Sequence, residues 1–301
     1  MSRALVVGCG YVGGALAERL REDGREVWAL RRRPRPGDDA IRWLSADVGD
    51  ERALTDALAP LRDGQPLEVH YLVSAGGFDD AAYQTAYVHG PKNVLSALEG
   101  AAVRRVVFAG STAVYGQTEG EWVDEESPTE PTGFSGRRLL EGEALLAAAP
   151  METVSVRFGG IYGPGRTRLI DQIAAGKAIA DPDGPQFRSR MHRDDCARTM
   201  RHLGRITAPA ARYLGVDDEP TDQRDVQAWL CERLGVEPAG LTPTGAARRG
   251  GNKRCRNARL RATGLELRFP TYREGYGALL SDLGLGGAGT VGSSATLETS
   301  R

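Results

Sequence analysis

The sequence predicts an α/β fold, a doubly wound parallel sheet with a small C-terminal lobe, and three observations predict it. A short apolar run at the start of the chain leads into a G-x-G-x-x-G turn, Gly8 to Gly13, and then into apolar residues at helical period. Short apolar runs then alternate with helical patterns up to Arg157. Beyond Gly165 this alternation breaks down. We therefore expect a Rossmann-type sheet in residues 1–165 and a lobe mainly in residues 166–283, some of whose segments return to the sheet.

The first turn carries a glycine for each of three physical demands. Gly8 permits the tight turn, Gly10 lets the backbone approach a pyrophosphate, and Gly13 lets the helix pack closely on the strand. The first N–H groups of the helix then face the anion. The residues predicted to surround the pyrophosphate are Gly8, Cys9, Gly10, Tyr11, Val12 and Gly13. Residues 1–165 are thus a predicted NAD(P)-binding domain, and the lobe is predicted to hold the substrate.

Basic residues follow the second predicted strand, Arg25 to Leu30, where the adenosine ribose of a dinucleotide would lie. An NAD site usually has a carboxylate there, whereas this chain has Arg31 and Arg32, followed by Arg33 and Arg35. Guanidinium groups bind a 2′-phosphate through charge-assisted, often bidentate hydrogen bonds. The pattern favours NADP over NAD, and a solvated basic loop is the alternative.

Residues at the ends of two further strands complete the predicted cofactor site. An Asp after the third strand, Ile41 to Leu44, can accept a hydrogen bond from an adenine amino group or serve in a turn. Small residues after the fourth strand, Leu67 to Val73, would let a cofactor pass close to the backbone. The predicted cofactor residues at these ends are Asp47, Val48, Ser74, Ala75 and Gly76.

The other elements continue the alternation as far as the lobe. We expect helices at Glu51 to Leu58, Asp79 to Leu98 and Ser135 to Ala148, strands at Arg105 to Ala109 and Thr153 to Arg157, and an acidic surface loop at Gln117 to Gly133. Residues 284–301 are rich in Gly, Ser, Ala and Thr, so we expect a disordered tail there.

Charge and composition narrow the class of partner. Lys plus Arg number 39 against 40 Asp plus Glu, so the net charge of −1 gives no overall attraction to nucleic acid. The sequence shows no apolar run near the roughly 20 residues that cross a bilayer, and no signal-peptide layout precedes the first strand. The four cysteines are scattered, without the spacing of a metal site or a disulfide framework. We therefore expect a cytoplasmic protein whose partner is a small molecule, with no nucleic-acid, membrane or metal partner.

Five motifs follow one another at characteristic spacing. They are Gly8-Cys9-Gly10-Tyr11-Val12-Gly13, Gly110-Ser111-Thr112-Ala113-Val114-Tyr115-Gly116, Arg157 through Gly165, Met191-His192-Arg193-Asp194-Asp195, and Pro270-Thr271-Tyr272-Arg273-Glu274-Gly275-Tyr276. Together they resemble the short-chain dehydrogenase/reductase superfamily in its extended, NAD-dependent epimerase/dehydratase-like form, from Val6 to about Tyr276. The resemblance implies a dinucleotide-dependent oxidoreductase or epimerase, and a homodimer formed through the helices at 79–98 and 135–148.

The catalytic pair of this family is missing. Family members carry Tyr-x-x-x-Lys on the helix after the serine-bearing strand, where the Lys lowers the pKa of the Tyr that exchanges a proton with the substrate. In this chain Phe134 takes the Tyr position and Arg138 the Lys position, and Tyr87 lies nearest the place of the usual Asn. Ser111 alone remains. The sequence is therefore similar to the atypical branch of the superfamily.

Three functions compete at this point. In the first, hydride transfer at a carbonyl or secondary alcohol of a small polar metabolite survives: Ser111 orients the oxygen, Arg138 holds the cofactor, and Tyr87, Tyr115, Tyr162, His89, the substrate or water supplies the proton. The second is a non-catalytic NADP-binding sensor or scaffold. The third is a non-redox isomerase or cyclase on the same fold.

Overall fold

Seven parallel strands form the central sheet of the protein, in the order β11-β7-β5-β4-β1-β2-β3. The computed structural model describes residues 2–33, 40–179, 184–240 and 251–285. The strands are β1 (Arg3–Val7), β2 (Glu26–Arg31), β3 (Arg42–Ser45), β4 (Leu67–Tyr71), β5 (Val103–Ser111), β7 (Glu152–Phe158) and β11 (Arg212–Gly215). The chain runs outward from β1 to β3 and then returns to place β4 on the other side of β1. The predicted doubly wound sheet is confirmed, and its switch point lies between β1 and β4.

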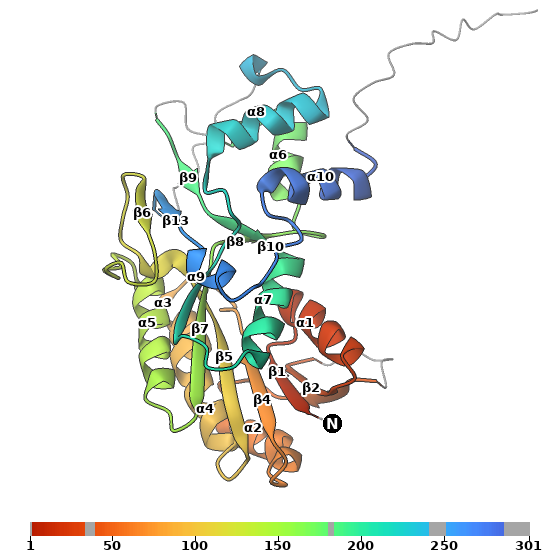
Figure 1. The fold of residues 1–301 in the computed structure, drawn as a ribbon, viewed down its shortest axis with the longest axis vertical. Helices are drawn as coiled ribbons and strands as arrows, with labels where there is room; N and C mark the ends of the chain where they lie inside the picture. The colour runs from red at the N-terminus through yellow and green to blue at the C-terminus, as the bar shows by residue number, and fades with distance from the viewer. Residues whose placement is uncertain (1, 34–39, 180–183, 241–250, 286–301) are drawn as a thin grey trace, which may run out of the picture.

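Helices cover both faces of the sheet, as its apolar strands require. On one face lie α1 (Tyr11–Glu22) and α7 (Arg193–Arg205), and on the other α2 (Glu51–Leu58), α4 (Gly90–Ala97) and α5 (Phe134–Ala147). Leu16 and Leu20 of α1 pack with Met200 of α7 in one core, whereas Leu54 and Val94 belong to the other. The molecule is therefore a three-layer α/β sandwich (Figure 1).

The lobe lies over the carboxyl ends of the strands (Figure 1). Its helices are α6 (Arg168–Ala174), α8 (Gln223–Leu234) and α10 (Tyr272–Asp282), and its strand pairs are β8 (Gly160–Tyr162) with β10 (Arg190–His192) and β9 (Phe187–Arg188) with β12 (Thr221–Asp222). Ile170, Leu230 and Tyr276 share its core. Between its segments, α7 and β11 return to the sheet, and α9 (Ala258–Arg261) contacts β11.

Two expected elements differ from what the structure contains. The helix predicted at 79–98 is α3 (Asp80–Gln84), a π-helical turn η2 (Thr85–His89) and α4 in succession. The segment predicted as a surface loop at 117–133 contains β6 (Glu121–Val123), which pairs in parallel with β13 (Lys253–Cys255). Strand β6 forms because it pairs with a segment far away in the sequence, so the local sequence pattern does not predict it. Short 3₁₀ turns lie at Ala59–Leu61, Thr112–Val114 and Pro238–Gly240. Of the predicted tail, residues 286–301 lie outside the described residues.

Candidate active site

The glycine turn after β1 is shaped as the sequence predicts. Gly8 has φ +87°, and a Cβ atom there would lie 2.6 Å from the backbone of Leu72 and Val73. A Cβ at Gly13 would overlap the carbonyl oxygen of Gly8. At Gly10, by contrast, the nearest described atom is 3.9 Å from the position of a Cβ. Gly8 and Gly13 are thus required by packing, whereas the missing side chain of Gly10 leaves the turn open to a ligand.

The helix behind this turn begins with donors rather than acceptors. Helix α1 starts at Tyr11, and its N-cap residue, Gly10, has no side chain that could cap the first N–H groups. The first turn of the helix contains no acidic residue. The amide groups of Gly8 and Cys9 donate to the carbonyl oxygen of Leu30 at 3.0 and 3.2 Å and fix the turn against β2. The positive end of the helix dipole thus lies at the open turn Gly8 to Gly13, which we call the glycine cradle. This geometry binds phosphate groups.

Arginines lie beside this cradle at the end of β2. Arg31 is the last residue of the strand, and Arg32 is exposed, with Nη1 3.8 Å from Oδ2 of Asp47. Oδ1 of Asp47 accepts the N–H of Gly49 at 2.9 Å, so the turn role weighed for this carboxylate is present. Val48 is buried, and its carbonyl oxygen accepts a hydrogen bond from Asn93. Arg33 is exposed, and Arg35 lies outside the described residues.

The loop after β4 reaches a tyrosine of the π-helical turn. The backbone N–H of Ala75, between the exposed Ser74 and Gly76, lies near the hydroxyl of Tyr87 and acts to lower its pKa. Burial raises the pKa of Tyr87 to about 12. Gly142 of α5 crosses directly over the carbonyl group of Tyr87. Single π turns occur frequently at functional sites, and this one places Tyr87 against the predicted cofactor loop.

Ser111 is the last residue of β5 and half-buried. Its Oγ accepts the N–H of Ala113 at 3.2 Å and caps the short turn that follows. A hydroxyl that accepts one hydrogen bond still has its own proton to donate, so the cap and an oxygen-orienting role are compatible.

At the positions of the family's Tyr-x-x-x-Lys pair, this chain has Phe134, which lies in an aromatic cluster, and Arg138, whose charge is balanced by carboxylates. The Phe134 ring contacts Phe78 and Tyr83, with centroids 5.2 and 5.4 Å apart. Arg138 donates two hydrogen bonds of 2.8 Å to Asp80 and further bonds to Glu141. Two carboxylates therefore balance its charge. These contacts tie α5 to α3, and the role of Arg138 in holding the cofactor stays a prediction.

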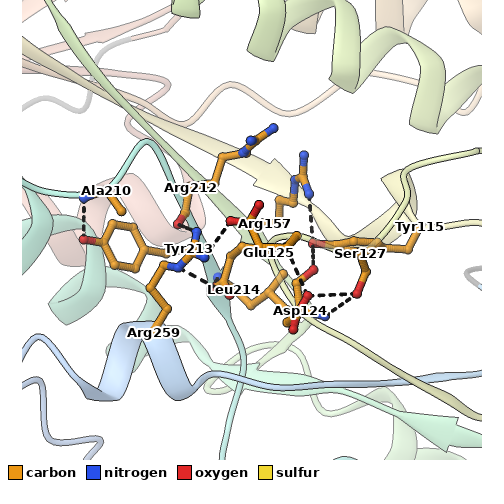
Figure 2. A network of polar contacts seen from close by, with 11 residues as sticks. Tyr115, Asp124, Glu125, Ser127, Arg157, Ala210, Arg212, Tyr213, Leu214 and Arg259 are labelled. Carbon is orange, nitrogen blue, oxygen red and sulfur yellow. Dashed lines mark hydrogen bonds and ion pairs between the residues drawn. The ribbon is translucent and has the colours of Figure 1, made fainter.

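Tyr115 belongs to a network of polar contacts with Asp124 and Arg157 (Figure 2). Its hydroxyl donates to the carbonyl oxygen of Asp124 at 2.7 Å and accepts from Arg157 at 2.8 Å. Arg157 is buried in a bidentate pair with Glu143. Burial raises the pKa of Tyr115 to about 12 despite the nearby guanidinium. The Tyr115 hydroxyl therefore anchors the 117–133 segment, and its contacts do not support the predicted role as proton donor.

Tyr162 is also enclosed. Its ring stacks on Tyr276 with centroids 4.5 Å apart, meets His192 edge-on and lies against the backbone of Gly275. Burial raises the pKa of its hydroxyl, which has no hydrogen-bond partner among the described residues. Its place in the lobe core argues against the predicted contact with substrate.

Sequence reasoning missed the aromatic neighbours of Phe134. Phe78 is 53% exposed and follows the Ser74–Gly77 loop directly, which was a usable signal. A basic segment, residues 248–256, contains Arg248, Arg249, Lys253, Arg254 and Arg256, and its aromatic partners were missed as well. The sequence shows none interleaved with it, yet Arg254 stacks on Trp122 and Phe187, which come from distant segments. Arg248 and Arg249 of that segment lie outside the described residues.

Within the described part of the chain, no three His, Cys, Asp or Glu side chains gather as metal ligands. The four cysteines, Cys9, Cys196, Cys231 and Cys255, are buried thiols. None of the helices in the described ranges is long and apolar enough to span a bilayer.

The parallel sheet, the open glycine cradle and the lobe over the strand ends define an enzyme of the short-chain dehydrogenase/reductase class. Residues 4–209 match the model of the NAD dependent epimerase/dehydratase family, and the chain belongs to this family. The resemblance drawn from the five motifs is thereby confirmed.

Two relatives and one further fold neighbour illustrate the range of the family. The chain is 29% identical over 256 residues to the 3-diazoavenalumate denitrifying reductase of a Streptomyces species. The aligned region covers 78% of this chain and 83% of that protein. A structure from Methylobacillus flagellatus assigned to the NAD-dependent epimerase/dehydratases is 40% identical, with a TM-score of 0.77 and coverage of 94% and 98%. MoeE5 in complex with UDP-glucuronic acid and NAD shares the fold at 24% identity, with a TM-score of 0.76 and coverage of 92% and 97%.

Proposed function

We propose that the protein is an NADP-dependent reductase that delivers hydride to a carbonyl, or a comparably electrophilic carbon, of a small polar metabolite. The observation that carries this proposal is the glycine cradle, open at Gly10 and backed by the N-terminus of α1, at the switch point of the sheet. Bound there, a nicotinamide supplies the hydride, and Gly8 to Gly13, Ser74, Ala75 and Gly76 would hold the dinucleotide.

Preference for NADP follows from Arg31 and Arg32. They are the residues at the end of β2, where the adenosine ribose lies in this fold, and Arg32 is largely exposed. The Asp47 carboxylate near Arg32 is 3.8 Å away, longer than a hydrogen bond, and leaves guanidinium donors available to a phosphate. The NAD-bound neighbour MoeE5 shares only the fold, so it does not decide the cofactor of this chain.

Reduction is favoured over epimerisation by the state of the candidate acids. Epimerisation through a ketone requires a base that removes a hydroxyl proton and later returns it. Phe134 has no group that can accept or return a proton, and burial raises the pKa of both Tyr87 and Tyr115 to about 12. Hydride addition to a strong electrophile needs only an oriented acceptor, which Ser111 can hold, while water supplies the proton. A reductase among the relatives supports this choice.

Binding of the cofactor is the first test. Calorimetric titration with NADPH and NADH should show tighter binding of NADPH, and replacing Arg31 and Arg32 together with Ala should weaken NADPH by roughly tenfold to a hundredfold with little effect on NADH. Arg104→Ala, an exposed position at the amino-terminal end of β5, is the matched control. Equal losses for both dinucleotides would reject the 2′-phosphate assignment.

Turnover separates the remaining functions. Consumption of NADPH with a panel of carbonyl and imine substrates is the result that a reductase requires. Tight NADPH binding with no turnover on any electrophile would favour the sensor or scaffold. Absence of dinucleotide binding would return the choice to a non-redox isomerase or cyclase.

A further inference from the structure

The aromatic ring of Tyr11 lies under two guanidinium groups. Cζ of Arg166 is 4.1 Å from the ring centroid, and Cζ of Arg193 is 5.4 Å from it. Tyr11 is the first residue of α1 and part of the glycine turn. The lobe side of the molecule thus places two cations directly beside the end of the helix that faces the cradle.

A tight turn fixes Arg166 in this place. The chain leaves β8 at Tyr162 and turns through Gly163, whose φ is +145°, and the N–H of Arg166 donates to the Gly163 carbonyl at 2.9 Å. A Cβ atom at Gly163 would lie 3.0 Å from the Tyr11 hydroxyl and 3.1 Å from Cβ of Arg193. Glycine at this position therefore allows the loop to pack against the glycine turn and brings Arg166 over the ring.

The two arginines differ in how their charge is balanced. Arg193 donates two hydrogen bonds of 3.0 and 3.1 Å to Asp194, and its side chain is 25% exposed. Arg166 is exposed, and no described carboxylate forms an ion pair with it. An exposed guanidinium held on an aromatic face keeps its N–H donors directed outward. The loop after β8 therefore places Arg166 beside the first turn of α1 as a positive charge with which no described carboxylate forms an ion pair.

We infer that Arg166, held on the Tyr11 ring, binds the pyrophosphate of the dinucleotide from the lobe side. The inference rests on the proposed function, since it requires that a dinucleotide occupies the glycine cradle. Helix N–H groups approach the pyrophosphate from below, and Arg166 closes over it from the loop after β8. This assigns a cofactor-binding role to a lobe residue and separates it from the proposed 2′-phosphate role of Arg31 and Arg32 at the carboxyl end of β2.

The experiment compares ligands that differ in the pyrophosphate. Affinities of NADPH, ADP-ribose and adenosine are measured by calorimetry for the wild type, Arg166→Ala, Arg166→Lys and the neighbouring Arg168→Ala. Arg166→Ala should weaken NADPH and ADP-ribose by about tenfold and leave adenosine unchanged, because one charge-assisted contact to phosphate is lost. Arg168→Ala should match the wild type, and Arg166→Lys should lie between the two. The salt dependence of NADPH binding should be shallower in Arg166→Ala.

Each outcome decides the matter. Equal NADPH affinity in Arg166→Ala and the wild type would overturn the inference while leaving the proposed function intact. A loss that extends equally to adenosine would also overturn it, because the variant would then act through the shape of the turn. If the wild type binds ADP-ribose through Arg166 but no nicotinamide dinucleotide, the anion site stands and the proposed reductase does not. Thermal unfolding of each variant checks that the fold is intact, and Arg166→Lys carries the test if Arg166→Ala does not fold.

Discussion

Burial sets the protonation state of the aromatic and imidazole groups near the carboxyl ends of the strands. Desolvation raises the pKa of Tyr87 and Tyr115 to about 12, and for Tyr115 it outweighs the nearby Arg157 guanidinium. The same effect lowers the pKa of His192 to about 4, although the Asp194 carboxylate acts to raise it. At neutral pH these tyrosines keep their protons and His192 is neutral.

His192 makes stability depend on pH. Its folded pKa of about 4 lies below the ordinary 6.5, so the unfolded chain takes up the proton first as the pH falls. The stabilising contribution is therefore complete above about pH 6.5 and is lost as the pH falls toward 4. We expect the free energy of unfolding to drop by on the order of 2 kcal/mol across this range. Urea denaturation at several pH values measures it.

His192→Asn is the variant that isolates this effect. Nδ1 of His192 accepts the N–H of Asp194 as the cap of α7, and Asn is a good capping residue without a titrating proton. The groups facing the imidazole are Asp194, Arg193, Arg268 and Arg19. Asp195, whose pKa is raised by burial, acts in the opposite direction in both proteins. If the free energy of unfolding falls as steeply with decreasing pH in His192→Asn as in the wild type, the assignment to His192 is refuted.

Residues differ in how far the sequence reveals their role. Gly8 and Gly13 were predicted because their task is set by the turn in which they lie, and the structure shows the close contacts that require glycine. The role predicted for Arg138 depended on partners, and its partner Asp80 lies on another helix. The partner of Tyr115, Arg157, likewise comes from another strand, so the sequence alone did not reveal this contact. The spacing of residues in the sequence indicates where the backbone needs glycine. It does not indicate which side chains will be in contact, because that depends on how distant elements pack together.

At the scale of elements, the π-helical turn η2 is held by close packing against α5. Gly142 lies directly over the carbonyl group of Tyr87, and no larger residue fits without a backbone shift. This contact explains why the segment between α3 and α4 holds Tyr87 toward the loop after β4. Periodicity predicted a helix over the whole range because a single wider turn barely alters the pattern of apolar residues.

Replacing Gly142 with Ala should therefore destabilise the protein, although Ala is the better helix former. We expect a loss of about 2 to 4 kcal/mol in the free energy of unfolding, because the added methyl overlaps the Tyr87 carbonyl. The matched control is Gly277→Ala in α10, where no described heavy atom lies within 4 Å of the added Cβ. That change should stabilise by about 0.5 to 1 kcal/mol. Chemical denaturation compares the two, and equal effects would contradict the packing argument.

Elements of the sheet were more predictable than those of the lobe. Strands β1 to β5 and β7 were expected within a few residues, since each is an apolar run bounded by turn residues. Strand β11 was not identified, as it is four residues long and begins with an exposed arginine. The two-residue strands β9 and β12 form only because they pair with each other, and strands this short have no recognisable sequence pattern.

On the scale of the whole molecule, the helices α3 to α5 form the face through which we predict a homodimer. An exposed aromatic, Phe78, lies at the edge of this face against Phe134. Burial of that ring between subunits would favour association. Sedimentation at micromolar concentration should show a dimer that Phe78→Asp weakens. Trp122→Asp, at another exposed aromatic, should not, and a monomeric wild type would end this prediction.

The pairing of β6 with β13 governs the order in which the chain can assemble during synthesis. Trp122 and Arg254 are register partners, yet more than a third of the polypeptide lies between them. A ribosome releases the first βαβ unit, with its glycine turn, long before residues 253–255 emerge. Closing so large a loop is entropically costly and must wait for the sheet to bring both ends together. The β6–β13 pair therefore forms late. A chain that ends before residue 253 retains the glycine turn, but its Trp122 lacks the neighbouring strand β13.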